Sequence, residues 1–116
     1  MRITFVDSLT RRQINEASAF SVVAKFWDDS TEVWTASTPT SVRYRVDTPG
    51  GSQILDWTAA SAASSVTINV PYTANAIQND GAEAEGRVLT VQRDAGLTNQ
   101  FSATYPYRVN NLVGQT

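Results

Sequence analysis

The chain has 116 residues, a formal net charge of −2, and neither cysteine nor histidine. That length accommodates one domain around a single hydrophobic core. Without cysteine it can form no disulfide or thiolate metal site, and without histidine it lacks the commonest general base and metal ligand. We therefore expect no catalytic residues, no cofactor and no metal.

The distribution of charge and hydropathy disfavours two classes of partner. Lys25 is the only lysine, and the other basic residues are arginines spread along the chain. Phosphate affinity depends on concentrated Lys and Arg, so we expect no nucleic-acid partner. No run approaches the roughly 20 apolar residues that cross a bilayer, and residues 1–7 alternate like a strand instead of forming a secretion signal. We expect the protein to be made in the cytoplasm and to have no membrane partner.

Apolar and polar residues alternate with a period of two along most of the chain, which is the pattern of half-buried β-strands. The alternation is cleanest over residues 41–47, where Val42, Tyr44 and Val46 share one face. Turn-forming residues separate the segments at short intervals, for example at residues 48–52. The predicted strands are residues 1–6, 19–27, 41–47, 53–58, 65–70, 87–93 and 100–109.

The inward-facing positions of these strands are predicted to form the core. In the fourth strand the alternation assigns Leu55 and Trp57 to one inward face, and in the last it assigns Phe101 and Tyr105. A slip of one residue would turn every side chain of a strand to the other face. The predicted core is Ile3, Phe5, Phe20, Val22, Phe26, Val42, Tyr44, Val46, Leu55, Trp57, Val66, Ile68, Val70, Leu89, Val91, Phe101 and Tyr105.

Two segments have a weak helical pattern, at residues 9–17 and 74–79, and we predict no more than a single turn in each. The first is polar, with too little apolar surface to fold against the sandwich. It is therefore predicted to form an arm that contacts neighbouring subunits. Arginine suits that task because its planar fork pairs with carboxylates on a partner, which makes Arg11, Arg12 and Gln13 candidate interface residues.

The regular spacing of short strands and turns predicts one all-β domain, an immunoglobulin-like β-sandwich of about seven strands. Residues 1–17 would supply an N-terminal strand and arm, and residues 18–116 the sandwich itself. Pro106 lies inside the last predicted strand. Since proline cannot donate to a β-ladder, that part of the strand is predicted to be an edge or a bulge.

Acidic clusters are the remaining candidates for chemistry. One contains Asp28, Asp29 and Glu32, and the other contains Asp80, Glu83 and Glu85. The first could serve as a carboxylate pair of a glycosidase, and either could bind calcium through oxygen ligands. Neither has the alternating spacing or the glycine of a calcium loop, so we interpret both as solvated turns.

The tryptophans are candidates for recognition, because Trp is over-represented among the residues that carry binding energy. Trp57 is assigned to the core. Trp27 lies off the core face of its strand, and Trp34 flanks a threonine-rich stretch. Each of these two could anchor an interface or pack on a neighbouring strand.

Several runs of the chain share a pattern of strands, prolines and turns. They are residues 20–27, the acidic turn 28–29, residues 38–47, the Gly-Gly turn leading to Leu55, Asp56 and Trp57, and residues 88–96 and 107–112. In these runs the chain resembles the small immunoglobulin-like proteins of tailed-bacteriophage structural gene clusters. The resemblance covers residues 18–112, whereas residues 1–17 match nothing in that pattern.

The resemblance implies a virion component that acts only by binding other virion proteins and supplies no active-site residues. A capsid decoration or cement protein, bound to the major capsid protein, is the leading hypothesis. A neck or tail adaptor bound to neck or tail proteins is an alternative, as is a carbohydrate-binding or adhesion module, since fold does not fix function. A homo-oligomer is compatible with each. The candidate interface residues are Arg11, Arg12, Gln13, Trp27, Trp34 and Pro106.

Overall fold

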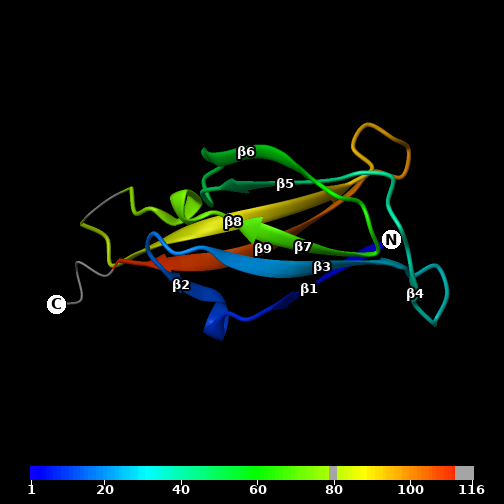
Figure 1. The fold of residues 1–116 in the computed structure, drawn as a ribbon, viewed down its shortest axis with the longest axis horizontal. Coiled ribbons are helices and arrows are strands. Elements are labelled where there is room, and N and C mark those ends of the chain that lie inside the picture. Colours follow the sequence, from blue (N-terminus) through cyan, green and yellow to red (C-terminus); the bar gives the residue numbers. More distant parts are fainter. Residues whose placement is uncertain (79–80, 112–116) are drawn as a thin grey trace.

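A computed structural model describes residues 1–78 and 81–111, and two β-sheets packed face to face make up most of it (Figure 1). The first sheet contains β1 (Arg2–Asp7), β3 (Phe20–Asp28), β7 (Ser65–Val70) and β4 (Thr35–Ala36). The second contains, in spatial order, β2 (Gln13–Asn15), β9 (Phe101–Asn110), β8 (Ala84–Arg93), β5 (Val42–Asp47) and β6 (Gln53–Ala60). Two short 3₁₀ turns complete it, η1 (Thr10–Arg12) and η2 (Tyr72–Asn75). No helix in this part of the chain is long and apolar enough to span a membrane.

The strand pairing follows the immunoglobulin-like order. β3 lies between β1 and β7, while β5, β8 and β9 are neighbours in the other sheet and β6 extends it beside β5. β2 runs parallel to β9, so the N-terminal segment gives one strand to each sheet. The predicted all-β sandwich is confirmed. The described residues hold nine strands instead of about seven, because β2 and β4 are short pairings within predicted connections.

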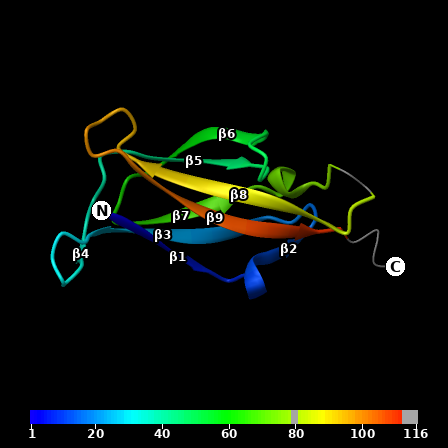
Figure 2. The same ribbon diagram turned by 180° about the vertical axis from the view of Figure 1, so that it is seen from behind.

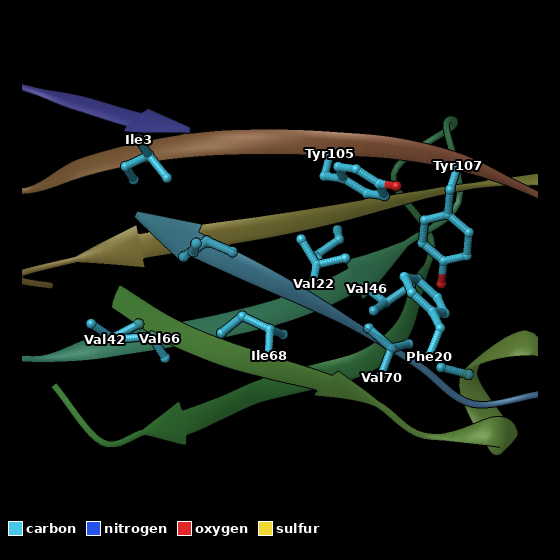
Figure 3. Packing of buried hydrophobic residues seen from close by; sticks show 14 of the residues in the cluster. Ile3, Phe20, Val22, Val42, Val46, Val66, Ile68, Val70, Tyr105 and Tyr107 are labelled. Carbon is cyan, nitrogen blue, oxygen red and sulfur yellow. The ribbon is translucent and has the colours of Figure 1, made fainter. Parts of the chain in front are cut away.

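The core lies between the inner faces of the two sheets, where aromatic rings interlock. The Phe20 ring meets the Tyr107 ring edge-on at 4.8 Å between centroids, and Figure 3 shows the two side by side. The buried apolar residues are Ile3, Phe20, Val22, Ala24, Phe26, Val42, Val46, Val66, Ile68, Val70, Ala74, Leu89, Val91, Tyr105, Tyr107 and Val109. Most predicted core positions are among them, and Phe5, Tyr44 and Leu55 are half-buried against this cluster. In it, burial raises the pKa of the Tyr107 hydroxyl.

Trp57 is not in the core, so that prediction was wrong. On β6, Leu55 opposes Val46 whereas Thr58 opposes Tyr44, which leaves two residues of β6 where β5 has one. Such a bulge reverses the alternation of side chains beyond it. Trp57 consequently lies on the outer face of the second sheet, where it is half-buried.

Phe101 was also assigned to the core and is instead 37% exposed. It is the first residue of β9, at the end where the sandwich gives way to loops. Exposure decreases along the same face of this strand, since Ala103 is half-buried and Tyr105 is fully buried. The alternation therefore gave the correct face, but too little of the molecule covers that face at the end of the strand.

The segment predicted to be a free arm folds onto its own sandwich, so the argument that it has too little apolar surface to do so was wrong. Leu9 and Ile14 pack against the core. β2 pairs with β9, and the Glu16 N–H donates to the Asn110 carbonyl at 2.9 Å. Two apolar side chains and a short ladder are enough because the segment lies along an existing strand edge. The predicted single turn in it is η1.

The turn predicted at residues 74–79 lies earlier, at η2, and Asn79 is outside the described residues. Within residues 1–78 and 81–111, the part of β9 around Pro106 pairs with β8 alone, because β2 reaches only residues 108–110. The prediction of an edge at Pro106 is confirmed.

Candidate functional site

The candidate site is the end of the sandwich where the β3–β5 connection and the β8–β9 loop meet, which we name the loop end and define as residues 29–41 and 94–101. Figures 1 and 2 show the two loops at the same end of the molecule, at opposite corners. Large exposed apolar side chains occur at both corners: Val33 and Trp34 at one, and Leu97 and Phe101 at the other. Binding residues commonly lie on loops that a rigid scaffold positions.

Trp27 and Trp34, the two predicted anchors, lie together at the first corner. Trp27 is on the outer face of β3 and its Nε1 donates to the Thr4 hydroxyl at 2.9 Å, which fixes the indole. The Trp34 ring lies 6.3 Å from it, and the Arg2 guanidinium stacks 4.2 Å from the Trp34 centroid. Trp27 is therefore half-buried support, while Trp34 remains 43% exposed beside Val33 at 73%.

The acidic turn at this corner is occupied by local contacts. The Ser30 N–H donates to the Asp28 carboxylate at 3.0 Å and lowers the pKa of Asp28. The Met1 amino group donates to Asp29 at 2.7 Å and lowers the pKa of Asp29, with a further contact from Arg2 at 3.3 Å. Among residues 1–78 and 81–111, no group of three or more acidic side chains is placed to hold a metal. Asp80 of the second acidic group lies outside these residues.

A buried ion pair holds the base of the second corner. Asp94 follows β8 with a φ of 54° and is fully buried, and it accepts from Arg93 Nε at 2.7 Å. The Thr40 N–H also donates to the Asp94 carboxylate at 2.6 Å, and the Asp94 N–H donates to the Ser41 carbonyl at 2.9 Å. Arg93 further donates to the Ser37 hydroxyl at 2.8 Å. The pair thus joins the two loops of the loop end.

The Asp94 carboxylate remains ionised at neutral pH despite its burial. Burial raises its pKa, but the hydrogen bonds from Arg93 and from the Thr40 N–H outweigh burial, so the pKa lies below its ordinary value. Beyond it the loop closes on itself, because the Leu97 N–H donates to the Asp94 carbonyl and the Gly96 N–H to the Gln100 side chain. Leu97 is 51% exposed on this closed loop.

The third tryptophan lies elsewhere, on the outer face of the second sheet. The Arg43 guanidinium lies 4.0 Å from the Trp57 ring centroid and the Arg45 guanidinium 5.4 Å from it. Arg43 also donates to Gln92 at 2.7 Å, and Arg45 pairs with Asp47 at 2.6 Å. The Trp57 ring therefore packs against arginine side chains of its own sheet.

The remaining predicted interface residues do not join the loop end. Arg11 and Arg12 are exposed in η1, with the Arg12 guanidinium 4.5 Å from the Tyr105 ring centroid. Gln13 accepts from Asn110 Nδ2 at 3.2 Å within the β2–β9 pairing. Pro106 is exposed on β9. Phe101 was predicted to lie in the core and Leu97 was not predicted at all, although an apolar residue in the middle of a polar turn is itself a signal.

No family model matches the chain, and no curated protein matches it. The chain is similar in structure to a conjugative transposon lipoprotein from Bacteroides eggerthii, with a TM-score of 0.45 and 9% identity over 90% of this chain and 95% of that chain.

Proposed function

We propose that this chain is a non-enzymatic binding module that contacts another protein through its loop end. The observation that carries the proposal is the pairing of exposed apolar side chains with a rigid base. The Trp34 and Leu97 side chains remain exposed in the folded chain, so their burial contributes little to its stability. The loops that carry them are nevertheless fixed by Trp27 and by the buried Arg93–Asp94 pair. Preorganised loops reduce the entropy lost on binding.

A protein partner is favoured over a sugar. A sugar site needs open aromatic faces in a groove with convergent polar groups. The Trp34 and Trp57 rings are instead covered on one side by guanidinium groups, at 4.2 and 4.0 Å from the ring centroids. Exposed apolar side chains at two corners of one end suit a broad protein–protein interface. A stable interface buries on the order of 1,000 Å² or more of accessible surface.

We further propose that the partner is a virion protein and that the chain is a structural component of a tailed-phage particle. Decoration of the capsid is the leading placement. This setting is supported by the resemblance of residues 18–112 to immunoglobulin-like virion proteins, and the binding-module assignment agrees with it.

The test is the composition of particles purified from the strain that carries the gene. Quantitative mass spectrometry should find the chain in many copies per particle. A variant that combines Trp34→Ala with Leu97→Ser should keep its melting temperature but be depleted from particles, whereas Arg11→Ala with Arg12→Ala should be retained. Absence of the chain from particles would refute the virion setting, and full occupancy of the Trp34/Leu97 variant would refute the loop end.

A further inference from the structure

β7 has one unpaired edge, on the side facing away from β3. Among the described residues it pairs with β3 alone, and the Phe26 N–H donates to the Ser64 carbonyl at 2.9 Å at the start of this ladder. Successive residues of an antiparallel strand direct their backbone N–H and C=O groups alternately toward and away from the neighbouring strand. Since Ser64 faces β3, the backbone groups of Ser65, Thr67 and Asn69 face away from β3.

The hydrogen bonds around this edge agree with that phase. The Tyr44 hydroxyl donates to the Asn69 carbonyl at 3.4 Å, so this carbonyl does face away from β3. In the part of the chain that the structure describes, the outward N–H groups of Ser65 and Thr67 donate no hydrogen bond and their carbonyls accept none. β7 therefore offers a row of donors and acceptors for a further strand.

This edge lacks the features that usually prevent strand addition. Natural edges are blunted by charges, proline, bulges or a covering segment. The β9 edge has Pro106 and is partly covered by β2, and the register of β6 shifts twice against β5. β7 has the sequence SVTINV, with no charge and no proline, and its pairing with β3 is continuous over six residue pairs.

A groove accompanies the open edge. A cavity of 410 Å³ lies between β7 and β6, lined by Tyr44, by residues of β7 itself, and by the small side chains of Ala59, Ala60, Ser61 and Ala63. In immunoglobulin constant-type domains a fourth strand occupies this position in the sheet. Side chains of an added strand would alternate between the groove and the outer face of the sheet.

One unpaired charge lies near the same edge. Lys25 is opposite Ser65 on the outer face of the first sheet, and within residues 1–78 and 81–111 it makes no ion pair. An added strand would lie about 10 Å from β3, two strand spacings away. An acidic side chain placed beside Ser65 on that strand would be within reach of the Lys25 ammonium.

We propose that the free edge of β7 accepts an extended strand from a partner protein, by β-augmentation. The fitting segment is about six residues long, has apolar side chains at alternate positions to fill the groove, and has an acidic residue beside Ser65. Pairing of two β7 strands from two copies fits less well, because the apolar side chains of β7 are already buried and would leave the groove empty. This surface is separate from the loop end, and the proposal does not depend on it.

The probe is a capped synthetic peptide, Thr-Val-Glu-Val-Thr-Val, titrated into the full chain and followed by amide NMR. Binding should shift the amides of Ser65 and Thr67 and protect them from exchange. Thr67→Pro removes an outward N–H without removing a bond to β3, and should weaken binding at least about tenfold, or about 1.4 kcal/mol. Thr67→Val, the matched control, should bind like the wild type.

Further variants separate the outcomes. Lys25→Met should weaken binding of this peptide but not of its Glu-to-Gln analogue, and it keeps the test informative if Thr67→Pro does not fold. The Trp34/Leu97 variant should bind the peptide normally, so failure at the loop end would not be mistaken for failure here. The proposal would be overturned if about 1 mM peptide caused no amide shifts at β7. At that concentration only complexes with dissociation constants well above about 1 mM would escape detection. A dimer of the free chain disrupted by Thr67→Pro would also overturn it, in favour of self-pairing.

Discussion

The two ends of the sandwich are each organised by a buried arginine, but the two arginines have different partners. At the loop end, Arg93 pairs with the fully buried carboxylate of Asp94. At the opposite end, Arg87 donates to main-chain carbonyls next to and within η2, and to Glu85 at 2.9 Å. One end therefore depends on two buried charges that must stay together, and the other depends mostly on neutral acceptors.

The difference has consequences for stability and for binding. Loss of one member of a buried ion pair leaves the other uncompensated, which costs more than an unsatisfied carbonyl. In return, the ion pair joins two loops that are distant in the sequence, since Asp94 contacts Thr40. The loop end can thus present exposed apolar side chains without relying on those side chains for its own stability.

The largest expected effect is at the buried pair. Asp94→Ala should lower the free energy of unfolding by about 3–5 kcal/mol, because it leaves the Arg93 guanidinium buried without its counter-charge. Urea denaturation measures this loss. The double variant Asp94→Ala with Arg93→Met, which removes both charges, should recover part of the stability. No difference between the single and double variants would contradict the ion-pair account.

A smaller effect is expected at the opposite end. Arg87→Met keeps most of the side-chain volume but removes the donor to the carbonyls of Ala74 and Ala76 and the ion pair with the partly exposed Glu85 carboxylate. A loss of about 1–3 kcal/mol in the free energy of unfolding is expected, because the buried carbonyl of Ala74 goes unsatisfied. Hydrogen exchange should show the loss of protection around η2 and not at the loop end. A loss as large as that of Asp94→Ala would remove the contrast between the two ends.

The buried pair of the loop end should also respond to acid. A carboxyl group whose pKa is lowered by folding stabilises the folded state above its ordinary pKa of 3.8 and loses that contribution as the pH falls through the folded-state value. The difference in unfolding free energy between wild type and Asp94→Asn should therefore be constant near neutral pH and shrink below about pH 4. Urea unfolding from pH 7 to acid measures it. Because Asp28 and Asp29 are common to both proteins, their titration cancels.

The alternation of apolar and polar residues predicted the strands well because each sheet buries only one of its faces. Every second residue of a strand points to that buried face and is apolar. The alternation failed where the period is interrupted without any marker in the sequence. No glycine or proline marks the bulge between Leu55 and Thr58. The N-terminal segment was misjudged because its main support is a β9 edge almost a hundred residues away in the chain.

The site was less predictable than the fold. The sequence suggested Trp27 from its position off the core face and Trp34 from the threonine-rich stretch beside it, and the structure places them together. The Arg93–Asp94 pair could not be predicted, because the acceptor's other contact, Thr40, is 54 residues away. Such contacts arise from the meeting of two loops, for which the local pattern carries no signal.

Trp57→Ala tests the bulge directly. Because Trp57 lies on the outer face against Arg43 and Arg45, its removal should cost about 1 kcal/mol, the size of a partly exposed cation–π contact. Phe26→Ala is the matched control in the core, where about 3–5 kcal/mol is expected. If Trp57→Ala costs as much as Phe26→Ala, the bulge is misplaced and the original inward assignment stands.

The smallest expected effect is at Leu97, and it is the sharpest test of how the loop end is built. Leu97 is 51% exposed, and the loop beneath it is held by the Gly96–Gln100 and Leu97–Asp94 hydrogen bonds, which involve only backbone groups and the Gln100 side chain. Leu97→Ser should therefore change the free energy of unfolding by no more than about 0.5 kcal/mol, as for other surface positions. If the loop end binds a partner, the same variant should weaken binding while Asp94 stays buried and paired. A marked loss of stability would mean that Leu97 packs within the domain, and the rigid-base account of this corner would have to be given up.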